Sequence, residues 1–304
     1  MIERHTLTLP HGISLECRSS GERGRPVLLF LHGFPEAAFV WDELLTHFSR
    51  PEHGGYRCVA PNLRGYAGSS TPPDVRDYRA KHLVQDVLAL IALEADGAPL
   101  AALVAHDWGG AVAWNLAALH PQQLERLAIV NSPHPGTFLR ELQQSPEQQA
   151  ASAYMSFLCR PDAAALLAED DFRRLWSFFT NMGAADGPHA WLTDAVKAQF
   201  RAVWRQGLDG ALNYYRASPL RPATASDPGA TTVTLPRAML EVHVPTHVLW
   251  AMDDTALPPG LLDGLGDFVP KLHLTQLPGA THWVVHEQPQ RVIAWLAGAL
   301  AARP

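Results

Sequence analysis

An aspartate occupies a place in the sequence where a carboxylate could do chemistry. The stretch LAALVAHDWGGAVAWNLAAL, residues 100–119, is apolar at both ends and carries Asp107 in its polar middle. An apolar run followed by two glycines and a helical pattern predicts a buried strand that turns sharply into a helix. The N-terminus of such a helix favours a carboxylate through its unpaired N–H groups. Asp107 could therefore be a reactive group at the strand end, or simply the N-cap of the helix.

The elements that would position Asp107 alternate between strand and helix. Residues 3–9 and 13–17 flank a PHG turn and predict a β-hairpin. The run PVLLFLHGFP is continuously apolar until its Gly and Pro, as in strands that are buried on both faces of a parallel sheet. Residues 78–93 follow with the period of an amphipathic helix. This alternation continues to residue 133 and predicts a mostly parallel sheet with flanking crossover helices.

The pattern changes between residues 134 and 236. Helical segments and loops dominate there, and TTVTLP is the main stretch with a strand-like composition, although it also suits a linker. Strand and helix alternate again from PTHVLWAMDD to the closing helix QPQRVIAWLAGALAA. We therefore predict an α/β core formed by residues 1–133 and 237–304, with residues 134–236 inserted as a helical cap.

Composition narrows the class of protein. Of the 304 residues 47% are hydrophobic and 18% are charged, which is enough apolar sequence for a large core. The net charge is −6 and no Lys/Arg block occurs, so we expect no nucleic-acid partner. No apolar run approaches the roughly 18 residues of a membrane span, and the N-terminus has no secretory pattern. Three widely spaced cysteines suit a reducing compartment, and we predict a cytoplasmic protein.

The turn around Asp107 resembles the nucleophile elbow of the α/β-hydrolase superfamily, with Asp in the nucleophile's place and Ala105 where many relatives have Gly. The letters HDWGG at 106–110 resemble the epoxide hydrolase branch in particular. HGFPE is similar to the family's oxyanion loop, LWAMDDTAL to its acid loop and GATHWVVHEQP to its histidine loop. The resemblance covers nearly the whole chain. It implies an α/β-hydrolase fold with Asp107 as nucleophile, Asp254 as the triad acid and His282 as the base; Asp253, next in sequence, is the alternative acid.

An Asp nucleophile implies particular chemistry. A carboxylate with an ordinary pKa of about 4 is ionised at neutral pH and can attack a saturated carbon without a base. The product is an ester on the enzyme, which water must cleave with the help of His282 and Asp254. The resemblance implies that the backbone amides of Phe34 and Trp108 stabilise the oxyanion of that step.

Two segments of the predicted cap indicate which leaving group the site would stabilise. YMSFLCRP and GALNYYRAS resemble epoxide hydrolase segments that each carry a catalytic tyrosine, which here falls on Tyr154 and Tyr215. Two phenols would donate to the oxygen of an opening epoxide, whereas Tyr214 is expected to be a core residue. The alternative is a haloalkane or haloacetate dehalogenase with the same Asp-His-Asp triad. Haloacetate dehalogenases, however, carry arginines where this chain has Trp108 and Ala111.

The sequence therefore predicts an epoxide hydrolase that forms a vicinal diol. We find no metal-ligand spacing and no nucleotide-binding motif, so no cofactor and no metal are expected. The expected partners are a small-molecule epoxide and water, without a membrane; a homodimer is compatible with the sequence. We expect Glu36 to support the oxyanion loop. The resemblance implies that His106 is a structural neighbour of the nucleophile without a chemical role, and His286 is expected to be a surface or packing residue.

Overall fold

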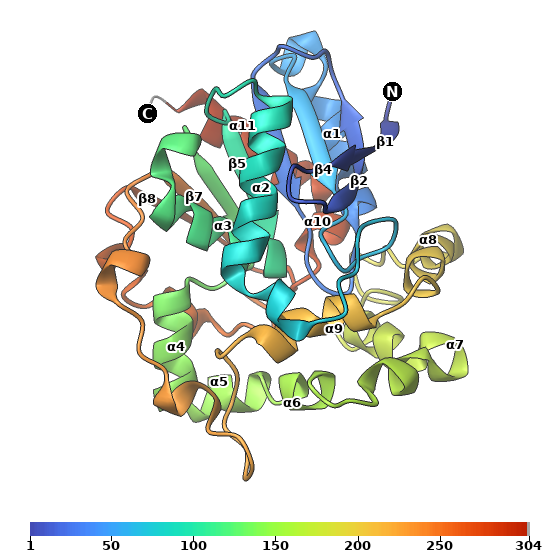
Figure 1. Ribbon diagram of the computed structural model, residues 1–304, viewed down its shortest axis with the longest axis vertical. Coiled ribbons are helices and arrows are strands. Elements are labelled where there is room, and N and C mark those ends of the chain that lie inside the picture. The colour runs from blue at the N-terminus through green and yellow to red at the C-terminus, as the bar shows by residue number, and fades with distance from the viewer. Residues whose placement is uncertain (303–304) are drawn as a thin grey trace.

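The computed structural model describes residues 1–302, and an eight-stranded sheet lies at the centre of that part of the chain (Figure 1). The strand order is β1-β2-β4-β3-β5-β6-β7-β8. The strands are β1 (Glu3–Thr8), β2 (Ser14–Ser20), β3 (Val27–Leu31), β4 (Arg57–Pro61), β5 (Ala102–His106), β6 (Leu127–Val130), β7 (Thr246–Ala251) and β8 (Leu272–Leu277). The predicted hairpin is confirmed, since β1 pairs with β2 and β2 with β4 in antiparallel fashion. All other pairs are parallel.

Helices cover both faces of the sheet, which is why β3 to β7 are buried along their whole length. The helices that flank the sheet are α1 (Asp42–Phe48), α2 (Ala80–Glu94), α3 (Asp107–Leu119), α10 (Val284–Glu287) and α11 (Pro289–Ala301). Successive strand residues point to opposite faces. Leu29 and Leu103 belong to the cluster that includes α2 and α3, whereas Phe30 and Val104 belong to the cluster that includes α1 and α11.

The strand order brings two loops together at one edge of the sheet. The chain proceeds from β3 outward to β4 and then returns to place β5 on the other side of β3. Leu31 pairs with Ala105 in the parallel register, so the loop after β3 and the turn after β5 emerge side by side. Open α/β sheets place their sites at such switch points, beyond the carboxyl ends of the strands.

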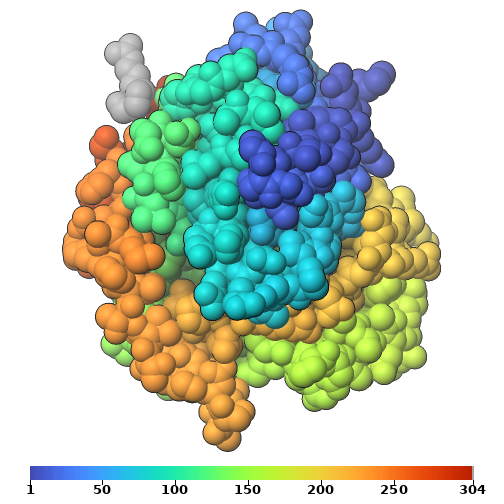
Figure 2. Space-filling view, in the orientation of Figure 1, coloured from blue at the N-terminus to red at the C-terminus, as the bar shows by residue number. Residues whose placement is uncertain are grey.

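Six helices separate β6 from β7. They are α4 (Pro135–Gln144), α5 (Pro146–Ala151), α6 (Tyr154–Leu158), α7 (Ala163–Thr180), α8 (Asp194–Trp204) and α9 (Asp209–Ala217). Figure 1 shows them gathered below the sheet, and the space-filling view shows them closing over that end of the molecule (Figure 2). Residues 134–236, which contain these helices, are the segment that we propose as the cap.

Two local features of the cap depart from regular structure. The stretch TTVTLP forms no strand: Gly229–Thr232 is a 3₁₀ turn and the following residues are irregular, which suits a linker. Helix α7 is interrupted at Asp170, Asp171 and Phe172, which all have positive φ. Among residues 1–302, no helix combines the length and the apolarity that crossing a bilayer requires.

Candidate active site

Asp107 lies in the sharp turn between β5 and α3, with φ of +49°. Its surroundings leave no room for larger neighbours. A Cβ on Gly33 would lie 2.2 Å from Asp107 Oδ1, and one on Gly109 would lie 2.5 Å from the carbonyl oxygen of Leu31. The glycines of the elbow and of the facing loop are therefore required by close approach. The N-cap residue of α3 is His106, so the side chain of Asp107 does not serve as the cap.

The Asp107 carboxylate is oriented by the loop that follows β3. The backbone amide of Phe34 donates a hydrogen bond of 2.7 Å to Asp107 Oδ1. Ser132 Oγ donates to the carbonyl of Asp107 at 2.7 Å and fixes the backbone of the turn. Of the two amides expected at the oxyanion position, that of Phe34 is the one that contacts the carboxylate in the described residues. Asp107 also lines the cavity that is described below.

His282 and Asp254 come from the loops after β8 and β7. His282 Nδ1 lies 2.7 Å from Asp254 Oδ2, and His282 Nε2 lies 3.8 Å from Asp107 Oδ2. Asp254 is buried, whereas Asp253 is exposed. Of these two adjacent aspartates, the structure therefore brings Asp254 to the histidine. Its other oxygen, Oδ1, accepts hydrogen bonds from the amides of Ala256 and Leu257 at 2.9 and 3.0 Å.

The charges of this group shift one another's pKa. Burial alone would lower the pKa of His282, but the charge and hydrogen bond of Asp254, together with the charge of Asp107, raise it from 6.5 to about 9. Burial would likewise raise the pKa of Asp254, but His282, Asn131 and the Ala256 amide hold it below its ordinary value. Both shifts favour the charged form of each partner, so the geometry stabilises a protonated His282 beside an ionised Asp254.

Asn131 is a residue of this group that the sequence prediction missed. It directly follows β6 with φ of +37°, and its Nδ2 donates to Asp254 Oδ2 at 2.8 Å. Its Oδ1 accepts from the Ala251 amide at 2.8 Å, which ties β6 to the end of β7. A polar residue directly after the buried run LAIV was the available signal.

Glu36 is the centre of a second hydrogen-bond network, which is connected to the triad through His106. Glu36 Oε2 lies 3.0 Å from His106 Nδ1, and Glu36 Oε1 lies 2.8 Å from His286 Nε2. His106 Nε2 in turn lies 3.0 Å from the carbonyl oxygen of His282. Burial opposes ionisation of Glu36, but the two histidines hold its pKa well below the usual range. Glu36 does support the oxyanion loop, yet it does so through His106 and His286, which were expected to be a structural neighbour and a surface or packing residue.

The cap supplies aromatic side chains to a cavity of about 550 Å³ that Asp107 also lines. Asp107, Trp108, Tyr154 and Tyr215 all line it. The ring of Tyr215 lies edge-on to Trp108 at 5.0 Å between centroids and to Tyr154 at 6.2 Å. Burial, reinforced by the nearby charge of Asp107, raises the pKa of both tyrosines, so both hydroxyls stay protonated. Two phenols and a carboxylate therefore share one largely apolar space.

Tyr214 differs from its neighbour Tyr215. The two side chains are about equally buried and both line the cavity, but the hydroxyl of Tyr214 donates to the carbonyl of Arg64 at 2.9 Å. That bond anchors helix α9 to the core. Within residues 1–302, no three His, Cys, Asp or Glu side chains lie together as metal ligands would.

Comparison with known proteins finds a family and several solved structures to which this chain is similar. A family model described as alpha/beta hydrolase fold matches residues 26–289. The AB hydrolase superfamily protein YfhM of Bacillus subtilis is 33% identical over 283 residues, which is 92% of this chain and 91% of that protein. An epoxide hydrolase structure from metagenomes of hot environments is 36% identical with a TM-score of 0.84 and full coverage of both chains. The inhibitor complex of Bacillus megaterium epoxide hydrolase is 28% identical with a TM-score of 0.86, covering 98% of this chain and all of that one.

Proposed function

The chain belongs to the alpha/beta hydrolase fold family, and we propose that within it the protein is an epoxide hydrolase that forms a covalent ester on Asp107. The observation that carries this proposal is the composition of the cavity. An aspartate held at one oxygen by the Phe34 amide lies across from two phenols, Tyr154 and Tyr215. The epoxide hydrolases among the similar proteins support the same reaction.

In the first step Asp107 opens the ring. Oδ1 is occupied by the Phe34 amide, so Oδ2 attacks a ring carbon and the bond from that carbon to the epoxide oxygen breaks. The departing oxygen takes a proton from the hydroxyl of Tyr154 or Tyr215. Phenols with raised pKa values are protonated before the reaction and suit an oxygen that becomes an alcohol.

In the second step water cleaves the ester. Esterification removes the negative charge of Asp107, and with it one of the influences that raise the pKa of His282. His282 gives up its proton, which restores through solvent the tyrosine that was deprotonated in the first step. The neutral imidazole then accepts a proton from the water that attacks Asp107 Cγ. The Phe34 amide, and by the family resemblance the Trp108 amide, stabilise the charge on the oxyanion. Collapse of the tetrahedral intermediate breaks the bond from Cγ to the ester oxygen, and that oxygen leaves as an alcohol of the diol with the second proton of the water. Asp107 is again a carboxylate, with one water-derived oxygen, beside a protonated His282.

The proposal is tested by stopping the reaction between its two steps. We expect the His282→Gln variant, incubated with styrene oxide, to gain the mass of the epoxide on the peptide that contains Asp107. Asp107→Asn under the same conditions serves as the matched control and remains unmodified. An unmodified Asp107 peptide in the His282→Gln protein, with binding verified, would contradict the scheme.

The dehalogenase alternative can be distinguished from epoxide hydrolysis by the product that the protein releases. The wild-type protein is given a panel of epoxides and a panel of haloalkanes and haloacetates, and both diol formation and halide release are measured. We expect diol from the epoxides. Halide release without diol formation would reassign the protein to the dehalogenases.

A further inference from the structure

We propose that Trp204, the last residue of α8, is a positioning residue that fixes the oxyanion loop from the cap and thereby controls the second step of the reaction. This inference rests on the proposed function, because it concerns cleavage of the Asp107 ester.

The contact that carries it joins the cap to the loop after β3. Trp204 Nε1 donates a hydrogen bond of 2.7 Å to the carbonyl oxygen of Pro35. Trp204 is 3% exposed, and the whole segment from His32 to Ala38 is buried. A buried carbonyl that loses its donor is costly, so the loop would shift toward another partner if this N–H were removed.

Pro35 is directly bonded to Phe34, whose amide donates to Asp107 Oδ1. The proline ring fixes φ at residue 35, which leaves few torsions between the anchored carbonyl and that amide. The side chain of Phe34 is also held from the cap, with its ring 6.1 Å from that of Phe178 and 5.3 Å from that of Tyr215. The position of the oxyanion donor is therefore set from the cap as well as from the core, where Glu36 holds the same loop.

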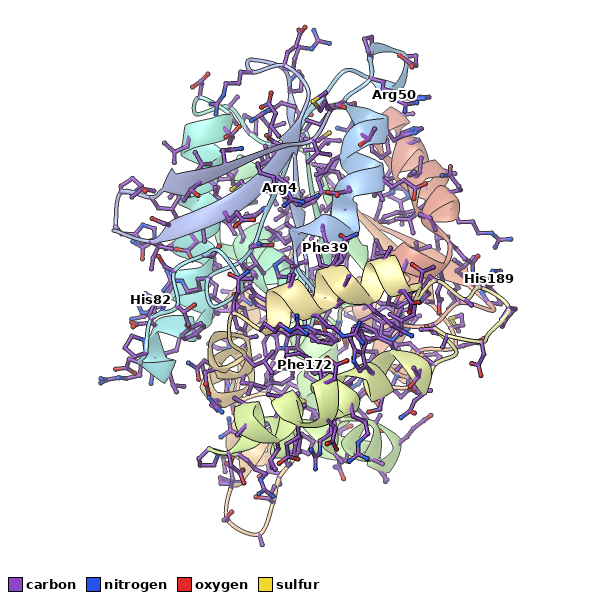
Figure 3. All side chains as sticks on the ribbon, turned by 90° about the vertical axis from the view of Figure 1, so that its right-hand side faces the viewer. Arg4, Phe39, Arg50, His82, Phe172 and His189 are labelled. Carbon is purple, nitrogen blue, oxygen red and sulfur yellow. The ribbon has the colours of Figure 1, made fainter. Side chains whose placement is uncertain are left out.

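The indole of Trp204 is rigidly mounted in a cluster of cap rings. Its centroid lies 4.4 Å from that of Trp176 and 5.3 Å from that of Phe200. Phe200 continues the cluster to Phe39 of the core at 5.0 Å, and Figure 3 shows Phe39 beside the helix α8. The cluster thus holds the N–H of Trp204 in a fixed direction, toward the oxyanion loop.

Several buried tryptophans of this protein are packed without a protein acceptor for the indole N–H in the part of the chain that the structure describes. Among the described residues, the buried Nε1 atoms of Trp41, Trp191 and Trp250 have no hydrogen-bond partner. Trp204 differs from them because its N–H reaches the residue next to the oxyanion donor. The place of this acceptor, next to the oxyanion donor, is what links Trp204 to the site.

The two steps of the reaction depend differently on the Phe34 amide. During ring opening the carboxylate loses charge, so a hydrogen bond to Oδ1 gives no advantage to that transition state. During ester cleavage Oδ1 gains a full negative charge, and loss of one such donor typically costs about 10²–10³ in rate. A displaced rather than deleted amide should cost less, about 10-fold in the hydrolysis rate.

The experiment replaces Trp204 by Phe and compares it with Trp176→Phe. Trp176 is in the same ring cluster, but its Nε1 donates to the carbonyl of Asp171, away from the oxyanion loop. With styrene oxide in rapid-quench experiments, we expect Trp204→Phe to open the ring at the wild-type rate and to hydrolyse the ester about 10-fold more slowly. The alkyl-enzyme then accumulates, so kcat and KM fall together while kcat/KM stays within about twofold. Trp176→Phe should change neither rate by more than about twofold.

Three results separate the possibilities. If Trp204→Phe and Trp176→Phe behave alike, or if ring opening slows and hydrolysis does not, the positioning role is wrong. If wild-type protein itself forms no ester, the proposed function fails instead. Should Trp204→Phe fold poorly, 3-benzothienylalanine at position 204 keeps the ring volume and removes only the N–H, and the same kinetic pattern is expected.

Discussion

Asp107, His282 and Asp254 are held by hydrogen bonds from loops at the sheet edge, whereas Tyr154 and Tyr215 are held largely by contacts between aromatic rings. Asp254, for example, accepts hydrogen bonds from two backbone amides and from the side chain of Asn131. Tyr215 instead packs edge-on against Phe34, Trp108 and Tyr154.

The difference follows from what each side must do. Asp107 and His282 change charge during the reaction while Asp254 stays ionised beside them, and buried charges are tolerated only with fixed hydrogen-bond partners. The tyrosines must meet substrates of varied shape, and aromatic packing positions a ring without prescribing one polar geometry. We therefore expect substitutions of His282 and Asp254 to impair ester hydrolysis, and substitutions of Tyr154 and Tyr215 to impair ring opening.

The largest effect is expected from the triad acid. Asp254→Asn removes the charge that keeps His282 oriented and basic, so we expect kcat to fall about 10³-fold with accumulation of the ester. The exposed neighbour provides the matched control, and Asp253→Asn should leave kcat within about twofold. Steady-state diol formation and mass spectrometry of the Asp107 peptide measure both. Equal losses in the two variants would show that the contact between Asp254 and His282 does not matter for turnover.

A smaller effect is expected on the cap side. Tyr215→Phe and Tyr154→Phe should each lower the ring-opening rate about 10-fold, and together at least about 100-fold, because each phenol partly replaces the other. Tyr214→Phe makes the same change one residue away. This substitution leaves the carbonyl of Arg64 without its donor, so it should lower the thermal stability of the protein. The ring-opening rate should change by less than about threefold. A double variant that opens the ring at the wild-type rate would remove the phenols from the mechanism.

The smallest effect is expected on the pH dependence of the free energy of unfolding. His282 has a pKa of about 9 in the folded protein and 6.5 ordinarily, so its contribution to folding is fully present below pH 6.5 and is lost as pH rises through about 9. The wild-type protein should therefore lose on the order of 1–3 kcal/mol more stability than His282→Gln between these limits. Urea unfolding at pH 6 and pH 9.5 measures the difference. Parallel pH profiles for the two proteins would show that the pKa of His282 is not raised by folding.

Most of the architecture was accessible from the sequence, because local patterns report burial. Continuous apolar runs such as the one that contains β3 predicted a parallel sheet, and the break in alternation after residue 133 predicted helices between two parts of the sheet. The small residues around Asp107 predicted a sharp turn, and the turn is there. TTVTLP remained ambiguous, since β-branched residues alone do not make a strand without a neighbour to pair with.

Side-chain partnerships across long stretches of sequence needed the folded chain. Periodicity could not show that Asn131 donates to Asp254, or that Glu36 joins His106 to His286, because these pairs are 123, 70 and 250 residues apart. The bond from Trp204 to Pro35 spans 169 residues and depends on how α8 settles on the core. The sequence by itself determined the strand and helix order and the kinds of reactive group. The tertiary structure alone decided which of them meet, because a hydrogen bond depends on the relative placement of two elements and on a rotamer, neither of which a local pattern encodes.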